Sequence, residues 1–154
     1  MEFSTLNGYK VKDKKAIRFY DTVDDMINDT TLKEGMHAKT KGYYSVNDGG
    51  EAEYHITGTE SNSDYQEELD NGLYATLITD KKINVLQLGI KRNIEQDQSI
   101  LVNAILQKPS KCMLYFPSGK YYFENGLINN KRHDIIGDLN TVTDYDRNLN
   151  GTRF

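Results

Sequence analysis

Three histidine side chains are candidate ligands for a metal ion. His37, His55 and His133 stand far apart in the sequence, and none has a second histidine or a cysteine at metal-ligand spacing. His55 also falls on the polar side of an alternating stretch, where side chains face solvent. We therefore predict three surface histidines and no metal ligands.

The stretch Asp146–Gly151 is a candidate calcium loop. Its side-chain oxygens at Asp146, Asn148 and Asn150, followed by a glycine, match the first half of such a loop. The glutamate that completes the loop would fall after Phe154, and no flanking helix is predicted. A polar loop is the favoured interpretation, and calcium binding is the alternative.

Four aspartates could supply the carboxylate pair of a glycoside-cleaving site: Asp134, Asp138, Asp144 and Asp146. That chemistry needs two carboxyl groups roughly 5–10 Å apart. Closeness in sequence does not establish such a separation, and solvated loop acids are commoner. No Ser/His/Asp set or phosphate-binding loop is evident. We predict no catalytic, cofactor-binding or metal-binding residues in this chain.

The single cysteine and the tyrosines are expected to serve packing. Cys112 has no partner for a disulfide and opens a predicted core strand, where it is expected to be a buried, small apolar residue. A sugar-stacking platform could be built from six tyrosines: Tyr43, Tyr44, Tyr54, Tyr115, Tyr121 and Tyr122. Their strand-like patterning favours core and interface positions instead.

Composition limits the function classes. The 154 residues suffice for one domain or two small ones, and a net charge of -4 from interleaved charges disfavours a nucleic-acid interface. The chain has no apolar run long enough to span a membrane, so no membrane insertion is expected. It also has no apolar signal core.

Two groups of elements are expected to position these residues. The first is a helix over 21–32, with Val23, Met26 and Ile27 as its apolar stripe, followed by β structure over 37–46, 51–56 and 73–78. Its turns are predicted at Asn47–Gly50 and Asp70–Gly72.

The second group is a strand over 83–88, a helix over 97–107, and strands over 113–116 and 121–123. Asp97 is the predicted N-cap of this helix. Its apolar face is predicted to be Ile100, Leu101, Ala104 and Ile105.

The second group resembles the opening of the right-handed parallel β-helix of phage tailspikes and pre-neck appendage proteins, a pectate-lyase-like fold. The resemblance rests on Leu88-Gly89, Asn103–Ile105, Tyr115–Tyr121 and Ile135–Gly137. The family's usual glycine-rich loop is here Lys91–Asp97 without glycine, so ligand contacts of that loop are not carried over.

The first group resembles the segment that precedes the β-helix in the same family. The matching positions include Asp25-Met26, Gly42-Tyr43, Asp48–Gly50 and all of Asn71–Ile78. The resemblance implies a neck that joins a virion-attachment end to the β-helix shaft.

The expected fold is therefore mainly β with short helices: a small α+β neck module followed by the capped first turns of a right-handed parallel β-helix. The expected domains are an arm (1–20), a neck (21–82) and a β-helix that is cut short (83–154). Residues 1–15 are either a solvated end or an arm that docks onto another virion protein.

The resemblance implies a structural virion component that attaches a host-receptor-binding shaft and forms a homotrimer. Its expected partners are a phage collar, connector or tail protein and, through later residues, a host cell-surface glycan. An alternative is part of a capsule or teichoic-acid depolymerase whose catalytic turns lie beyond residue 154. An isolated carbohydrate-binding β module is a third option.

Overall fold

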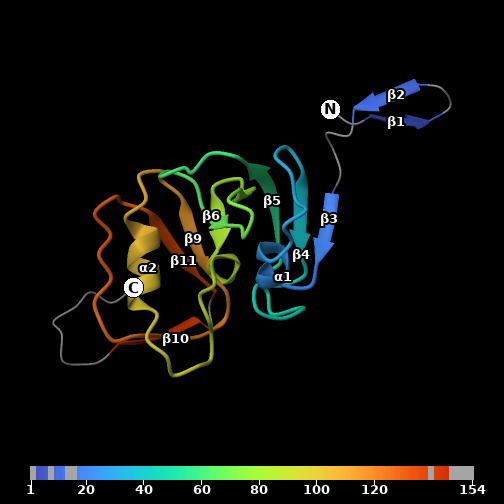
Figure 1. Ribbon diagram of the computed structural model, residues 1–154. Coiled ribbons are helices and arrows are strands. Elements are labelled where there is room, and N and C mark those ends of the chain that lie inside the picture. The colour runs from blue at the N-terminus through green and yellow to red at the C-terminus, as the bar shows by residue number, and fades with distance from the viewer. Residues whose placement is uncertain (1–2, 7–8, 13–16, 139–140, 146–154) are drawn as a thin grey trace. The chain divides into compact units, whose positions relative to one another are not determined.

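The computed structural model describes residues 3–6, 9–12, 17–138 and 141–145, with side chains for 17–138. It divides into two units (Figure 1). The sheet unit comprises Met1–Ser61 and Tyr65–Ile78, and the coil unit comprises Asn62–Asp64 and Thr79–Phe154.

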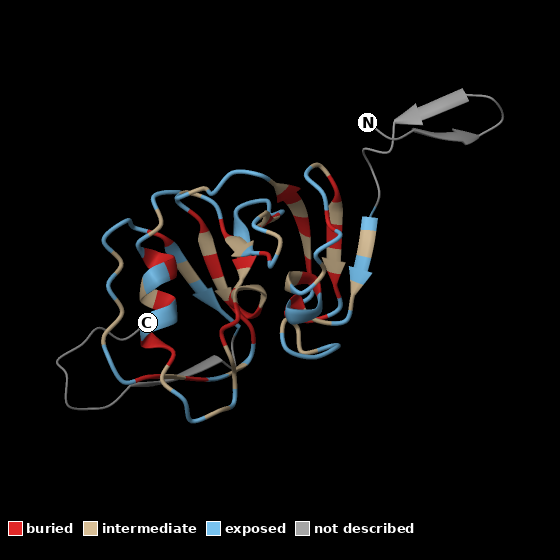
Figure 2. Cartoon of the chain, viewed as in Figure 1, coloured by how far each residue is buried: buried red, intermediate tan, exposed pale blue. Residues whose placement is uncertain are grey.

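The sheet unit is built on a five-stranded sheet in the order β3-β4-β5-β7-β6. The β3–β4 pair is parallel and the other neighbours are antiparallel. The strands are β3 (Ile17–Tyr20), β4 (His37–Thr40), β5 (Ala52–Thr57), β6 (Gln66–Glu68) and β7 (Tyr74–Leu77). β5 alternates buried and half-buried residues along its length, which confirms the predicted alternation (Figure 2). A separate antiparallel pair, β1 (Phe3–Leu6) and β2 (Tyr9–Lys12), precedes this sheet.

The first helix, α1 (Val23–Ile27), is shorter than the predicted 21–32. Thr22 and Asp25 form a capping box, in which Asp25 N donates to Thr22 Oγ1 (3.1 Å) and Thr22 N donates to Asp25 Oδ2 (3.0 Å). The helix ends at Ile27, and beyond its C-cap Asn28 the Asp29 Oδ1 accepts the Thr31 amide (2.9 Å), a local bond that competes with a helical one. Val23 and Met26 are buried, as the stripe predicts.

The β structure predicted over 41–46 is wrong, because residues 41–50 form a loop folded around Asp48. The Asp48 carboxylate accepts the amides of Tyr43 (3.1 Å), Tyr44 (2.7 Å), Ser45 (3.0 Å) and Gly50 (2.8 Å). The chain turns so tightly that a Cβ on Gly42 would lie 1.8 Å from Ser45 O. These amides bond a carboxylate and are not available to a sheet.

We therefore expect Gly42→Ala to lower the free energy of unfolding by about 2–3 kcal/mol, since the added methyl forces the loop off Asp48. Urea denaturation measures this loss. Gly58→Ala is the matched control, because its Cβ would meet only the flexible Glu34 side chain at 3.3 Å. Equal effects of the two variants would contradict the account of the loop.

The coil unit is a stack of parallel strands. β8 (Lys82–Asn84), β9 (Met113–Phe116) and β11 (Asp134–Gly137) form one sheet, in which Ile83, Leu114 and Ile135 share one register. β10 (Gly119–Phe123) pairs in parallel with β12 (Thr141–Tyr145), and Asp97 bridges the other side of β10. From β9 to β12, strands that follow one another in sequence thus alternate between two sheets. This is the repeating turn of a parallel β-helix and confirms the predicted coil.

The predicted strand over 83–88 is only partly right. β8 ends at Asn84, whose side chain accepts the Leu86 amide (3.1 Å) and begins the 3-10 helix η1 (Val85–Leu88). Val85 and Leu86 are both buried, whereas a continuing strand would turn them to opposite faces.

The predicted helix over 97–107 is present as α2 (Ser99–Leu106). Gln98 occupies its N-cap position without a side-chain bond to the helix, so Asp97 is not the cap. Asp97 Oδ1 instead accepts the amides of Ser99 (2.8 Å) and Glu124 (3.0 Å), which ties the start of α2 to the residue after β10.

The predicted apolar face of α2 is wrong for three of its four residues. Ile100 is 80% exposed, Leu101 is 39% exposed and Ala104 is exposed. The helix buries Ser99, Val102, Ile105 and Leu106 instead. Asn103 fixes this rotation, since its side chain donates to Gly126 O (3.0 Å) and accepts the Ile128 amide (2.8 Å).

Ile100 and Ile105 provide a matched pair for testing the orientation of α2. Ile105→Ala removes a side chain that is 5% exposed and is expected to lower the free energy of unfolding by about 2–4 kcal/mol. Ile100→Ala is expected to change it by less than about 0.5 kcal/mol. The reverse order in urea denaturation would restore the face predicted from the sequence.

Candidate functional site

His133 lies in the interior and not on the surface as predicted, since it is 4% exposed. Its Nδ1 lies 3.2 Å from Cys112 N and 3.3 Å from Cys112 Sγ, and its Nε2 lies 3.1 Å from Lys108 O. Because Nδ1 accepts the Cys112 amide, the proton sits on Nε2, which donates to Lys108 O. Cys112 is buried as predicted, so this pair joins the residues after α2 to the starts of β9 and β11.

His37 and His55 are half-buried and lie directly opposite each other on β4 and β5. Their ring centroids are 5.2 Å apart, and Glu53 Oε1 lies 3.5 Å from His37 Nδ1. Lys39 Nζ lies 3.0 Å from Glu53 Oε2, and its hydrogen bond lowers the pKa of Glu53. Within the described residues, no three histidine, cysteine or acidic side chains are placed to hold a metal.

The candidate carboxylates of the coil unit have partners of their own. Asp134 is exposed and lies 3.6 Å from Lys111 Nζ. Asp138 accepts the Tyr115 hydroxyl (2.8 Å) and the Ser118 amide (3.1 Å), and the Tyr115 bond lowers the pKa of Asp138. The side chain of Asp144, Asp146 and the candidate calcium loop 146–151 lie outside the described residues.

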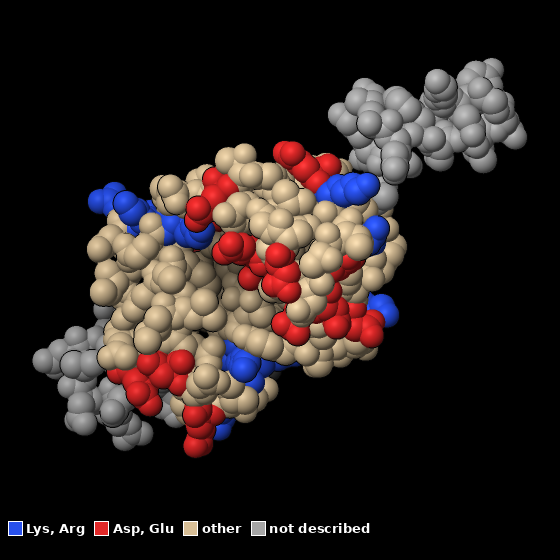
Figure 3. Space-filling view, in the orientation of Figure 1, with Lys and Arg blue, Asp and Glu red and all other residues tan. Residues whose placement is uncertain are grey.

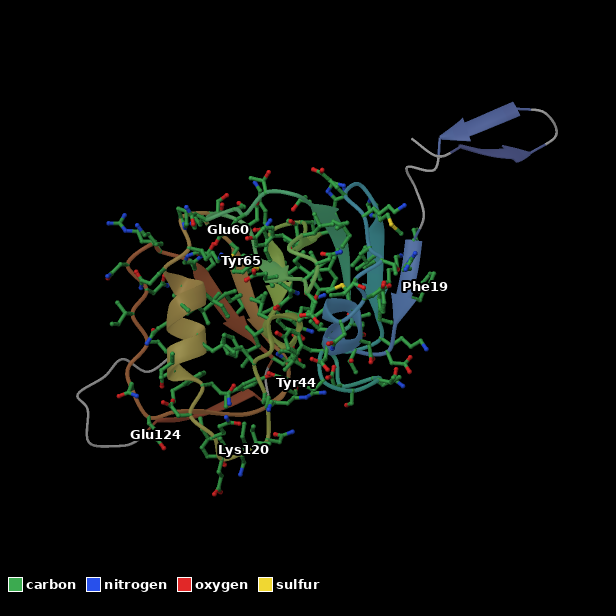
Figure 4. All side chains as sticks on the ribbon, in the orientation of Figure 1. Phe19, Tyr44, Glu60, Tyr65, Lys120 and Glu124 are labelled. Atoms are coloured by element: carbon green, nitrogen blue, oxygen red, sulfur yellow. The ribbon has the colours of Figure 1, made fainter. Side chains whose placement is uncertain are left out.

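The tyrosines divide between core and surface. Tyr54 and Tyr121 are buried, as predicted, and Tyr121 donates to Pro117 O (2.9 Å) inside the coil unit. Tyr44 is 52% exposed (Figure 4), and Tyr43, Tyr115 and Tyr122 are half-buried. The six rings therefore do not form one stacking platform.

Glu67 is the site that sequence reasoning missed. It faces inward beside Ala75, and the Tyr43 hydroxyl donates to its Oε1 (2.9 Å). Burial raises the pKa of Glu67, and the Tyr43 bond offsets part of that increase. Burial and then the charge of Glu67 raise the pKa of Tyr54, whose buried hydroxyl has no hydrogen-bond partner among the described residues.

The sequence carried one signal for this site. In the short strand Gln66–Glu68, Glu67 points to the opposite face from its two neighbours. It pairs with the small Ala75. A half-buried carboxyl beside tyrosine hydroxyls can hold a proton to higher pH than a solvated one. Among the described carboxyl groups, Glu67 is the one whose environment raises the pKa.

This environment predicts a pH dependence. Because the folded-state pKa of Glu67 lies above its unfolded value, its stabilising contribution is present below about pH 4.3 and is lost as pH rises through the folded-state pKa. Glu67→Gln keeps an acceptor for Tyr43 and cannot ionise. We expect its melting temperature to exceed that of the unmodified chain at pH 8 and to approach it at pH 4.

Glu53→Gln is the control for this measurement, because the pKa of Glu53 is lowered. Its stabilising contribution is present above the unfolded value and is lost as pH falls, so this variant should be the less stable one at pH 8. A Glu67→Gln chain that is destabilised at pH 8 would contradict the raised pKa.

Comparison with known proteins addresses the fold. Residues 82–153 match the family model described as "Rhamnogalacturonase A/epimerase, pectate lyase-like". The solved structure of Pantoea stewartii WceF, described as a glycan biofilm modifying enzyme with a tailspike-like parallel β-helix fold, is similar over 93% of this chain. The TM-score is 0.65 and the identity is 18%. The chain has a tailspike-like fold.

Two phage proteins share this tailspike-like fold. The tailspike gp49 of Acinetobacter baumannii bacteriophage Fri1, a capsular polysaccharide depolymerase, matches 84% of the chain at 14% identity and TM-score 0.56. Tailspike protein 2 of Escherichia coli O157:H7 bacteriophage CAB120 matches 76% at 17% identity and TM-score 0.56. The chain spans 24%, 23% and 16% of the lengths of WceF, gp49 and tailspike protein 2. No curated protein matches the sequence.

Residues 117–121 (Pro-Ser-Gly-Lys-Tyr), part of the resemblance to tailspikes, have a structural role in this fold. Gly119 has φ +154, and a Cβ there would lie 3.1 Å from Arg92 side-chain atoms. Asn93 Oδ1 accepts the Lys120 amide (2.9 Å), so the residues before α2 lie along β10 as the preceding turn of the coil.

Among the described helices, none combines the length and apolar character that crossing a membrane requires.

Proposed function

We propose that this chain is the attachment part of a phage tailspike or appendage protein. In this proposal residues 1–20 are an arm, 21–82 are a neck and 83–154 are the first capped turns of the β-helix. The chain holds a host-receptor-binding shaft on the virion, where its partner is a collar, connector or tail protein.

The observation that carries this proposal is the parallel register of the coil unit. Ile83, Leu114 and Ile135 lie in line on three successive turns, so each turn offers the next one a complete strand to pair with. A coil of this kind is a stiff rod that lengthens by one turn at a time. Such a rod suits a shaft, and the side chains of Asp97, Asp138 and Asn103 support its turns.

Exposed apolar side chains support self-association as a homotrimer. Ile100 is 80% exposed, and Ile128, whose backbone bonds the side chains of Asn103 and Gln107, is 53% exposed beside the same helix face. In the sheet unit Phe19 is 68% exposed. Exposed large apolar side chains on both units favour contact with further copies of the chain.

Light scattering tests the homotrimer directly. A chain of 17.7 kDa that trimerises is expected to elute with three times that mass at micromolar concentration. A monomer across the accessible concentration range would contradict the trimer.

A second candidate is a part of a glycan depolymerase whose catalytic turns follow residue 154. It is favoured by the descriptions of the similar structures as a glycan biofilm modifying enzyme and a capsular polysaccharide depolymerase. Both candidates can hold for one longer protein.

Glycan assays separate the roles of this chain and of a longer protein. With capsular polysaccharide or teichoic acid, we expect the 154-residue chain to release no new reducing ends or soluble fragments. The full-length protein is the positive control if the second candidate holds. Release by the chain itself would contradict its structural role.

A further inference from the structure

Two histidines lie side by side on the outward face of the sheet unit. His37 on β4 and His55 on β5 are directly opposite each other in the antiparallel register, so their Cβ atoms are about 4.5–5.5 Å apart. Both rings are half-buried, and the buried face of the same two strands carries Ala38 and Tyr54. The prediction of no metal ligands used spacing along the sequence, whereas this pair is formed by strand pairing.

Both rings have a nitrogen available to a ligand. The His55 side chain has no hydrogen bond or ion pair in the described part of the chain, where its contact is the ring of His37. Glu53 Oε1 lies 3.5 Å from His37 Nδ1, which favours a proton on Nδ1 and leaves Nε2 as the acceptor. Metal-binding histidines are commonly oriented by a carboxylate in this way.

The separation of the two rings fits a shared metal ion. With metal–nitrogen bonds of about 2.0–2.1 Å, each ring centre lies about 3.2 Å from the ion, and two such centres are about 5 Å apart at the tetrahedral angle. The ring centroids of His37 and His55 are 5.2 Å apart, and their planes are tilted by 47°. The strand register therefore sets a distance that two imidazoles on one ion require.

The charge of the sheet unit favours a cation at this pair. Residues 17–61 and 65–78 contain twelve acidic and four basic residues, for a net charge of -8. Figure 3 shows clusters of acidic side chains over this unit. Lys39 lies on the same face, but its Nζ is 3.0 Å from Glu53 Oε2, so its charge is compensated.

The other soft ligands of the described chain are not available to an added ion. His133 is 4% exposed, and both its ring nitrogens have partners. Cys112 is buried against it. The His37–His55 pair is thus the accessible imidazole pair of the described residues.

We propose that His37 and His55 together bind one divalent transition-metal ion. Since no third histidine, cysteine or acidic ligand is in place among the described residues, water completes the coordination. Imidazole suits Zn²⁺, Ni²⁺ and Cu²⁺, whereas Mg²⁺ and Ca²⁺ prefer oxygen ligands. The ion joins β4 to β5, and Glu53 is a positioning residue that acts through His37. The site and the proposed attachment role do not depend on each other.

Titration calorimetry with Zn²⁺ tests the site in the 154-residue chain. His37→Asn and His55→Asn are each expected to raise the Kd by about a hundredfold or more, because losing a ligand costs at least as much as losing the group that orients it. Thr76→Ser is the matched control, since Thr76 lies opposite His55 on β7 and the variant keeps both imidazoles and the hydroxyl. It should bind Zn²⁺ as the unmodified chain does.

Glu53→Gln tests the positioning role. It is expected to raise the Kd for Zn²⁺ by about tenfold, as loss of a carboxylate behind a metal-bound histidine does. Without metal, ¹⁵N spectra should show the ring proton of His37 moving from Nδ1 toward Nε2, which a purely structural role of Glu53 does not require. An unchanged tautomer would overturn this role.

Paramagnetic broadening tests the site without any substitution. Added Cu²⁺ should broaden the ring resonances of His37 and His55 together and leave those of His133 sharp. The effect should weaken as pH falls from 7.5 to 5.5, because a metal binds neutral imidazole. Mg²⁺ at the same concentration should not displace the Cu²⁺.

Three results would overturn the proposal. One is Zn²⁺ binding that persists unchanged in both histidine variants. Another is broadening of only one of the two rings, which would show separate single-histidine contacts. The third is displacement of Cu²⁺ by equal Mg²⁺, which would show an oxygen site. If a histidine variant fails to fold, the broadening experiment on the unmodified chain still decides.

Discussion

The coil unit depends on the parallel register that places Ile83, Leu114 and Ile135 in line. Side chains in such a column pack on their own kind from turn to turn, and the backbone of each turn completes the hydrogen bonds of the one before. A slip of one residue in any turn would move its buried residues to the outside. The turns between the strands must therefore have fixed lengths and shapes, and much of the polar sequence serves this purpose.

Polar side chains set these shapes by binding backbone amides. Asp48 folds the loop 41–50, Asp97 joins α2 to the end of β10, Asp138 holds the turn after β9, and Asn103 fixes the rotation of α2. Each bond satisfies an amide that has no partner in a sheet or helix. A carboxylate occupied in this way has a lowered pKa, as Asp97 and Asp138 have, and is a poor proton donor at neutral pH. Glu67 is the contrasting case, because burial acts on it more strongly than its one hydrogen bond.

The sequence predicted what depends on local pattern and missed what depends on distant partners. β5, the coil and the existence of α2 follow from alternation, turn residues and order along the chain. The rotation of α2 does not, because Ile100, Leu101, Ala104 and Ile105 form as good a stripe as Val102, Ile105 and Leu106, and the choice rests on Asn103 bonding residues 126 and 128. The burial of His133 likewise depends on Cys112 and Lys108, which precede it by more than twenty residues.

The helix α2, whose buried face was predicted wrongly, and the edge strand β3 have one physical feature in common. In both, apolar side chains lie outward while polar ones, Asn103 in α2 and Arg18 in β3, are used for bonds within the unit. Folding of a single chain does not bury these apolar groups, so their hydrophobic free energy is available only to an association. Burial of Ile100 and Phe19 against further copies of the chain would therefore contribute to the proposed self-association, at surfaces that the internal bonds of each unit have already fixed.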